Sequence, residues 1–106
     1  MGKEYRLRRS REFEAVKATG GVWSDRLLVL RLRPNGMPIS RFGFTVGSHV
    51  GVAVKRNKTK RRLREVVWRT AIEDGWDVVV IARQGASLAR FRELERSLTG
   101  LLRKAR

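Results

Sequence analysis

The chain has 106 residues, of which 25 are Lys or Arg and 10 are Asp or Glu, giving a formal net charge of +15. Its length and its hydrophobic fraction of 42% indicate one domain over residues 1–106 with a modest core. The chain contains no cysteine, which excludes disulfides and thiolate metal sites, and no apolar run reaches the roughly 18 residues that span a bilayer. Residues 1–6 lack the apolar core of a signal peptide, so we expect a cytoplasmic protein whose excess charge is matched by a polyanion.

The first predicted element is a helix that begins with Ser10 as its N-cap and runs to about Thr19. Glu12 lies in its first turn, where the helix dipole favours anions, and a Gly-Gly pair ends it. Phe13 and Val16 are the apolar residues of this helix.

Two strands follow the helix. Residues 27–33 are bulky and partly alternating, and residues 41–46 form the returning strand after a turn at residues 34–36. Residues 50–54 are expected to add a short third strand or a bend.

A strongly basic helix is predicted from about Asn57 to Glu73, with Gly75 as its C-cap. The β-branched run at residues 77–82 is typical of a buried strand. Ser87 is expected to cap a last helix. The apolar positions of that helix have helical spacing and are Leu88, Phe91, Leu94, Leu98, Leu101 and Leu102.

The element order is therefore α-β-β-β-α-β-α, where the third strand is the short one. This order predicts an α+β fold, a two-layer sandwich in which helices pack on a small and mostly antiparallel central sheet.

Positive charge is concentrated at residues 55–65, where seven of the first ten residues are Lys or Arg. A solvated helix face normally interleaves acidic residues at a spacing of four, but Glu65 is the only acid in this block. Leu63, Val66, Val67 and Ala71 have spacings that place them on one side of a helix. They would dock the helix on the core, which holds the cations at fixed positions. This pattern predicts a nucleic-acid-binding face.

The residue types needed for protein-based catalysis are sparse. His49 is the only histidine, and Glu73, Asp74 and Asp77 are the only acidic cluster, at a position that turn chemistry explains. We therefore expect no catalytic residue and no metal ligand in the chain. Phe13 follows a run of arginines, so it is interpreted either as a core residue or as part of a strand-binding surface.

Residues 53–65 resemble the signature of the bacterial ribonuclease P protein subunit, through Arg56-Asn57 and the basic residues that follow. Further similarity lies at residues 7–13, 41–46, 78–83 and 94–102. The resemblance implies a left-handed βαβ crossover through the basic helix. It also implies that a large catalytic RNA, with Mg²⁺ bound mainly by that RNA and by the substrate, removes the 5′ leader of precursor tRNA.

The resemblance also implies two sets of binding residues. The set expected to contact the catalytic RNA is Arg56, Asn57, Lys58, Lys60, Arg61, Arg62 and Arg64. The set expected to contact the leader is Arg8, Arg9, Phe13, Lys17 and Arg31.

The chain departs from the family pattern at residues 47–49 and Val52, and at Lys17 and Arg31, where relatives carry aromatics. We therefore expect more phosphate contact and less base stacking along the leader.

Two other functions fit parts of the sequence. A ribosomal protein or an RNA chaperone would share the size and charge but not the spacing of the basic block. A self-sufficient small nuclease would need clustered carboxylates. The expected partners are ribonuclease P RNA and precursor tRNA, with no membrane and no obligate protein partner.

Overall fold

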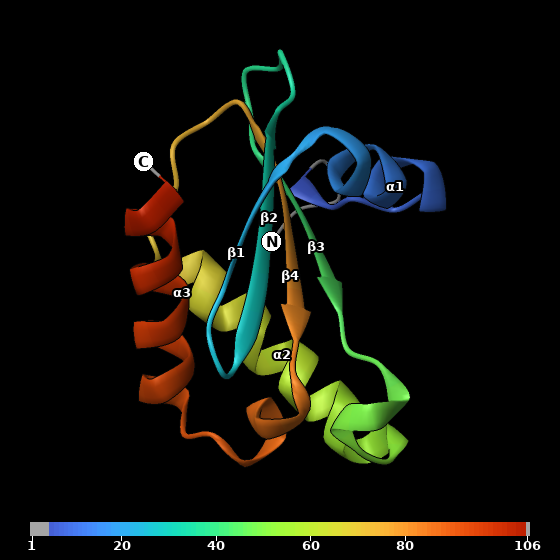
Figure 1. The fold of residues 1–106 in the computed structure, drawn as a ribbon, viewed down its shortest axis with the longest axis vertical. Coiled ribbons are helices and arrows are strands. Elements are labelled where there is room, and N and C mark those ends of the chain that lie inside the picture. Colours follow the sequence, from blue (N-terminus) through green and yellow to red (C-terminus); the bar gives the residue numbers. More distant parts are fainter. Residues whose placement is uncertain (1–4, 106) are drawn as a thin grey trace.

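The computed structural model describes residues 5–105, so residues 1–4, on which most of the expectation against a signal peptide depends, lie outside the described part. The helices are α1 (Ser10–Thr19), α2 (Ala53–Arg69) and α3 (Phe91–Ala105), with short 3₁₀ turns at Ser48–Val50 and Gln84–Leu88 (Figure 1). The strands are β1 (Gly21–Ser24), β2 (Leu28–Pro34), β3 (Arg41–Thr45) and β4 (Trp76–Ala82). They form one sheet in the order β1-β2-β4-β3.

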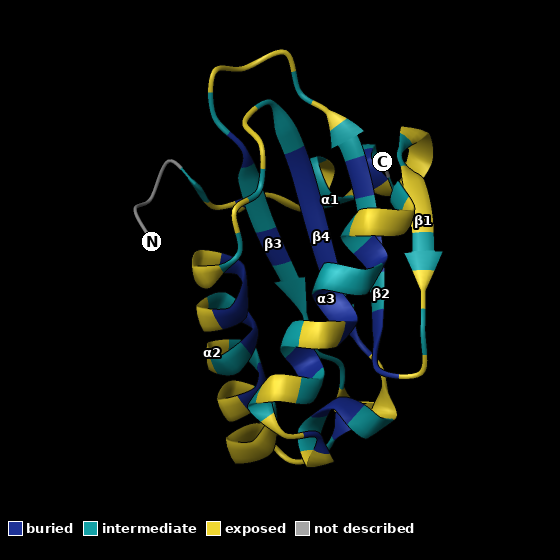
Figure 2. Cartoon of the chain, turned by 90° about the vertical axis from the view of Figure 1, so that its left-hand side faces the viewer, coloured by how far each residue is buried: buried dark blue, intermediate teal, exposed yellow. Residues whose placement is uncertain are grey.

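The central strand β4 pairs antiparallel with β2 and parallel with β3. Its β-branched residues alternate between two faces of the sheet. Val78 and Val80 belong to the main core, whereas Val79 belongs to a second, smaller cluster with Leu7 and Val16. Burial on both faces explains why this strand is almost continuously apolar (Figure 2).

Helices α2 and α3 cover one face of the sheet and supply most of the core. Leu63 and Val66 of α2 and Leu94 and Leu98 of α3 are fully buried there. Helix α1 lies across the opposite face and is anchored by Val16, which is also fully buried. The α+β class is therefore confirmed, with α1 as an additional cover on the second face. The order of helices and strands also matches the expected one, although the short strand is β1 and not the segment at residues 50–54.

The strand pairing differs from the simple hairpin predicted for residues 27–33 and 41–46. Strand β4 inserts between β2 and β3, so these two consecutive strands are not hydrogen-bonded neighbours. The expected third strand at residues 50–54 is also wrong, because this segment ends a 3₁₀ turn and begins α2. The additional strand is β1, which pairs antiparallel with β2 at the sheet edge.

The predicted helix ends also need correction. Helix α1 has Arg9 rather than Ser10 as its N-cap, and the Glu12 side chain bonds back to the Arg9 N–H at 2.8 Å. Helix α2 begins and ends about four residues earlier than predicted, and Gly75 lies in the turn before β4. Ala71, which was expected to dock this helix on the core, therefore lies beyond its end and is exposed. Helix α3 starts at Phe91, beyond the predicted cap at Ser87.

Leu88, which was expected on the buried face of the last helix, is 81% exposed. It lies in the 3₁₀ turn before α3, where the helical spacing of apolar residues does not apply. Among residues 5–105, no helix combines the length and apolar character needed to cross a membrane.

Candidate nucleic-acid interface

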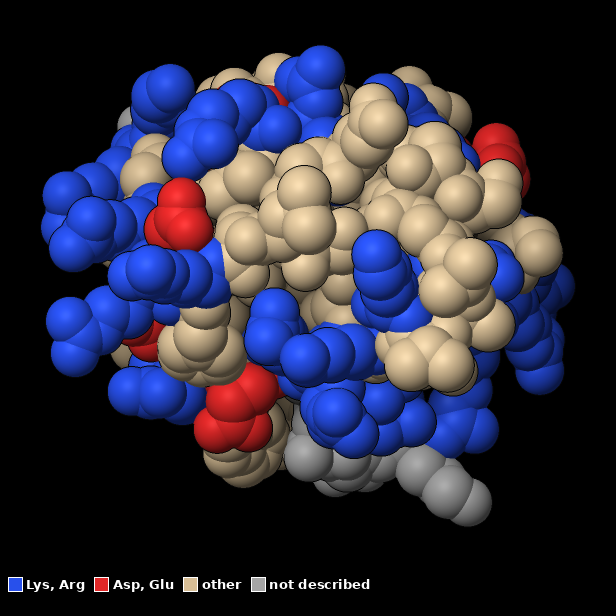
Figure 3. Space-filling view, turned by 90° about the horizontal axis from the view of Figure 1, so that it is seen from below, with Lys and Arg blue, Asp and Glu red and all other residues tan. Residues whose placement is uncertain are grey.

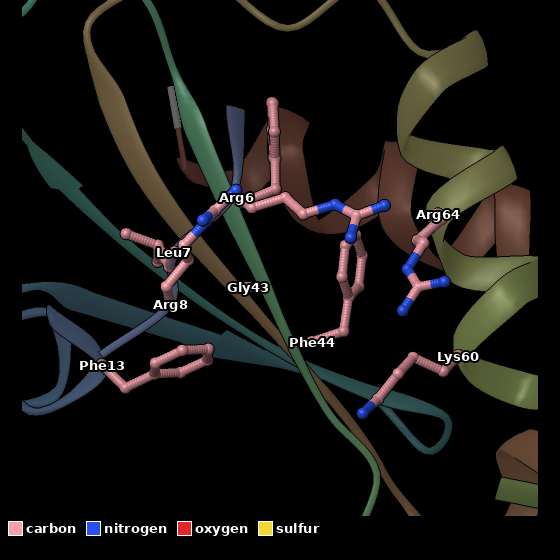
Figure 4. Close-up of a pocket in the computed structure, with 9 residues that line it drawn as sticks. Arg6, Leu7, Arg8, Phe13, Gly43, Phe44, Lys60 and Arg64 are labelled. Carbon is pink, nitrogen blue, oxygen red and sulfur yellow. The ribbon is translucent and has the colours of Figure 1, made fainter. Parts of the chain in front are cut away.

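A cleft of about 350 Å³ lies between the N-terminal segment, α1, β3 and α2. Strand β3 is an edge strand, and its residues alternate in direction, so that Gly43 meets α1 while Phe42 and Phe44 pack toward the α2 side. The cleft therefore wraps around the sheet edge, with Phe13 on one side of the β3 ribbon and Lys60 and Arg64 on the other (Figure 4). Its lining residues are Arg6, Leu7, Arg8, Phe13, Phe42, Gly43, Phe44, Lys60 and Arg64.

The cleft lining is cationic and aromatic. Arg6 and Arg8 come from the N-terminal segment and Lys60 and Arg64 from α2, and none of the lining residues is acidic. Figure 4 shows the Arg6 side chain reaching toward Arg64 across the Phe44 ring. Cations that face one another without a carboxylate are stabilised by an anion placed between them, and phosphate suits arginine and lysine.

Phe13 reaches the cleft because Gly43 leaves room for its ring. A Cβ atom built on Gly43 would lie 2.5 Å from two carbons of the Phe13 ring, which is far below van der Waals contact. The backbone of β3 therefore forms the surface on which the ring lies. Phe13 is half-buried by this contact and keeps part of its ring accessible.

We expect Gly43→Ala to displace the Phe13 ring and to destabilise the fold by about 1 to 3 kcal/mol, as overpacking typically does. Gly100→Ala is the matched control, because a Cβ at Gly100 meets nothing within 4 Å and alanine favours a helix interior by about 0.5 to 1 kcal/mol. Urea unfolding of both variants measures the difference. Equal stability of the two variants would contradict the close Phe13–Gly43 contact.

The start of α1 is fixed to the sheet by a partly buried ion network. The Arg41 guanidinium bonds the Asp77 carboxylate at 2.9 and 2.8 Å and the Glu12 carboxylate at 2.6 Å. The backbone N–H groups of Arg9 and Arg8 donate to Glu12 and, with Arg41, hold the pKa of Glu12 below its ordinary value. The hydrogen bonds from Arg41 to Asp77 raise the pKa of Arg41. This network sets the position of Arg8 and Phe13 beside the cleft.

The side chains of helix α2 face three directions. Thr59, Leu63, Val66 and Val67 are buried against the core. Lys60 and Arg64 are half-buried and line the cleft. The exposed residues of the basic segment are Lys55, Asn57, Lys58, Arg61 and Glu65.

The residues predicted to contact the catalytic RNA therefore do not form one continuous face. Asn57, Lys58 and Arg61 point outward, whereas Lys60 and Arg64 turn toward the same cleft as Phe13. The remaining two, Arg56 and Arg62, are half-buried. The Nη1 of Arg62 donates to the Ala89 carbonyl at 3.4 Å, and the buried Nε of Arg56 has no hydrogen-bond partner among residues 5–105.

The residues predicted to contact the leader fall into two places. Arg8 and Phe13 line the cleft, and Arg9 is exposed beside it at the start of α1. Lys17 and Arg31 lie outside the cleft lining and close to each other, since Arg31 Nη1 reaches the Lys17 carbonyl at 3.5 Å.

Sequence reasoning missed five residues that line the cleft, which are Arg6, Leu7, Phe42, Gly43 and Phe44. Arg6 forms a bridge with Phe42, and the Leu7 N–H donates to the Phe42 carbonyl at 2.9 Å, which brings the N-terminal segment to the edge of β3. The sequence did contain a signal for Arg6, because residues two apart in an extended segment, such as Arg6 and Arg8, point to the same side.

Asp77 of the acidic cluster and the single histidine have structural partners. Asp77 is bound by Arg41 and by the Asn35 amide, and His49 Nε2 lies 3.3 Å from the Ala82 carbonyl. Within residues 5–105, no three His, Asp or Glu residues come close enough together to hold a metal ion.

Positive charge extends beyond α2. In Figure 3, Lys and Arg side chains gather along the lower edge and also on the left, the side where α3 lies in Figure 1. Charge alone therefore does not identify the binding face, whereas the cleft combines cations with exposed aromatic surface.

The chain is similar along its whole length to one family of known proteins. The family model described as Ribonuclease P matches residues 1–106. The ribonuclease P protein component of Dehalococcoides mccartyi is 44% identical over 105 residues, which cover 99% of this chain and 88% of that relative. The corresponding protein of Roseiflexus castenholzii is 39% identical, and the match covers 99% of this chain and 88% of that relative.

Two solved structures have the same fold. The RNase P protein of Staphylococcus aureus is 31% identical with a TM-score of 0.86, and the match covers 96% of this chain and 95% of that one. The RNase P protein of Thermotoga maritima is 35% identical with a TM-score of 0.84, and the match covers 93% of this chain and 96% of that one.

Proposed function

Since the chain belongs to the ribonuclease P protein family, we propose that it is the protein subunit of the RNA-based endoribonuclease that removes the 5′ leader of precursor tRNA. In this role the RNA performs the chemistry. The protein contributes affinity for the substrate and a fixed distribution of positive charge.

The outward face of α2 is our proposed contact with ribonuclease P RNA. Asn57, Lys58 and Arg61 are exposed on this face, and Arg56 and Arg62 flank it. The buried residues of the same helix hold these side chains at fixed positions, which suits an RNA whose phosphates also have fixed positions.

The cleft beside Phe13 is our proposed path for the leader. Phe13 and Phe44 offer ring surface for bases, while Arg6, Arg8, Lys60 and Arg64 offer charge for phosphates. The observation that carries this proposal is the convergence of these groups in one cleft without any acidic residue. Lys60 and Arg64 would then contact the leader rather than only the catalytic RNA.

The physical contribution of the protein follows from charge. The phosphates of catalytic RNA and substrate repel each other, and a domain of net charge +15 between them lowers that repulsion. The cationic cleft disfavours a divalent cation, so the proposed Mg²⁺ ions would be held by the two RNAs. Leader contacts use ring faces and phosphates, so we expect weak sequence preference.

Phe13→Ala tests the leader contact. We expect the reconstituted enzyme to lose affinity for precursor tRNA about tenfold, because stacking of one base on an aromatic ring contributes roughly 1 to 3 kcal/mol. Affinity for mature tRNA, which has no leader, should be unchanged. Equilibrium binding to both RNAs measures this, and an equal loss for both would contradict a leader contact at Phe13.

A further inference from the structure

Trp68 is an exposed aromatic residue in the last turn of α2. It is 63% exposed, although tryptophan is usually largely buried. It lines a second cavity of about 250 Å³. The other residues that line this cavity are Tyr5, Ser40, Phe42, Val67, Thr70, Ala71, Ile72 and Asp74.

The second cavity adjoins the cleft beside Phe13, which is the proposed path of the leader. Phe42 lines both, and Arg64 of the cleft precedes Trp68 by four residues, or about one helical turn. Strand β3 and α2 thus form a path from Lys60 past Arg64 to Trp68. An RNA strand that places a phosphate at Arg64 would meet Trp68 one helical turn farther along α2.

The chemistry of the cavity suits a base better than a phosphate. Asp74 would repel a phosphate, whereas its carboxylate can accept a hydrogen bond from the amino group of a base. The hydroxyls of Ser40 and Thr70 already donate to the Glu73 and Val66 carbonyls. Three aromatic residues, Tyr5, Phe42 and Trp68, remain as ring surface.

We propose that Trp68, together with Tyr5 and Phe42, stacks one unpaired base of the 5′ leader beyond the nucleotides held beside Phe13. This inference rests on the proposed function. The proposed RNA-binding residues Arg56, Asn57, Lys58 and Arg61 lie in the first half of α2, whereas Trp68 is near its opposite end. A base at Trp68 therefore lies farther along α2 from these proposed RNA contacts than a phosphate at Lys60 or Arg64.

Leader length provides the test. We expect Trp68→Ala to weaken binding of a long-leader precursor to the reconstituted enzyme about tenfold, as loss of one stacked base does. Binding of a precursor with a leader truncated to two nucleotides should be unchanged. Trp68→Phe should retain affinity because it keeps a ring, whereas Trp68→Leu should behave like Trp68→Ala.

Leu88→Ala is the matched control, because Leu88 is 81% exposed and lines neither cavity. The inference is overturned if Trp68→Ala leaves long-leader affinity unchanged, or weakens both precursors equally. It is also overturned if Trp68→Ala weakens binding of the catalytic RNA alone, which would assign Trp68 to that RNA. An intact Phe13→Ala effect with no Trp68 effect would remove this inference and leave the proposed function standing.

Discussion

Arg41→Ala is expected to lower the free energy of unfolding by about 3 kcal/mol, because it leaves a buried carboxylate without its charged partner. The Asp77 side chain is only 2% exposed, and Arg41 supplies two of its hydrogen bonds. The Asn35 amide would remain as a neutral donor to Asp77. Urea unfolding monitored by circular dichroism measures the loss.

Arg26→Ala is the control for that experiment. Arg26 pairs with Glu93 at 3.3 Å, but the two side chains are 78% and 39% exposed, so solvent screens the pair. We expect a much smaller change in stability. Equal effects of the two substitutions would show that the Arg41 network does not anchor α1 to the sheet.

The second large effect is expected on RNA binding. The double variant Lys58→Ala and Arg61→Ala removes two exposed cations from the outward face of α2. Affinity for ribonuclease P RNA at low salt should fall on the order of tenfold. The slope of log affinity against log salt should become shallower by roughly 1.5, since each phosphate contact contributes about 0.7 to 0.9.

Arg92→Ala with Arg103→Ala is the matched control, because these exposed residues lie on α3 and their loss changes the net charge equally, from +15 to +13. We expect the control to retain most of the affinity and the salt slope. A similar loss in both double variants would mean that net charge, rather than the α2 face, determines binding.

Local sequence patterns predicted most of the fold. The apolar spacing of Leu63 and Val66, and that of Leu94 and Leu98, identified the buried faces of α2 and α3 correctly. The position of β4 between β2 and β3 was not predicted, because strand order depends on contacts between segments far apart in the chain. Strand β1 was missed because it is only four residues long and mostly exposed.

The sequence predicted the residue types of the candidate site, but only part of their arrangement in space. The basic block was visible as charge without acidic partners, yet its division into an outward face and a cleft face depends on where β3 packs against α2. Arg6 joins the cleft through its bridge to Phe42, and Phe13 through the absence of a side chain at Gly43. Both contacts are tertiary, so the sequence alone could indicate the residues but not their convergence.

Cleavage of precursor tRNA at low Mg²⁺, by a bacterial ribonuclease P RNA with and without this protein, tests the central claim most directly. We predict that the protein stimulates cleavage only when the RNA is present and that the protein alone has no activity. Cleavage by the purified protein alone, or tight RNA binding without stimulation, would contradict the proposed role as the protein subunit of ribonuclease P.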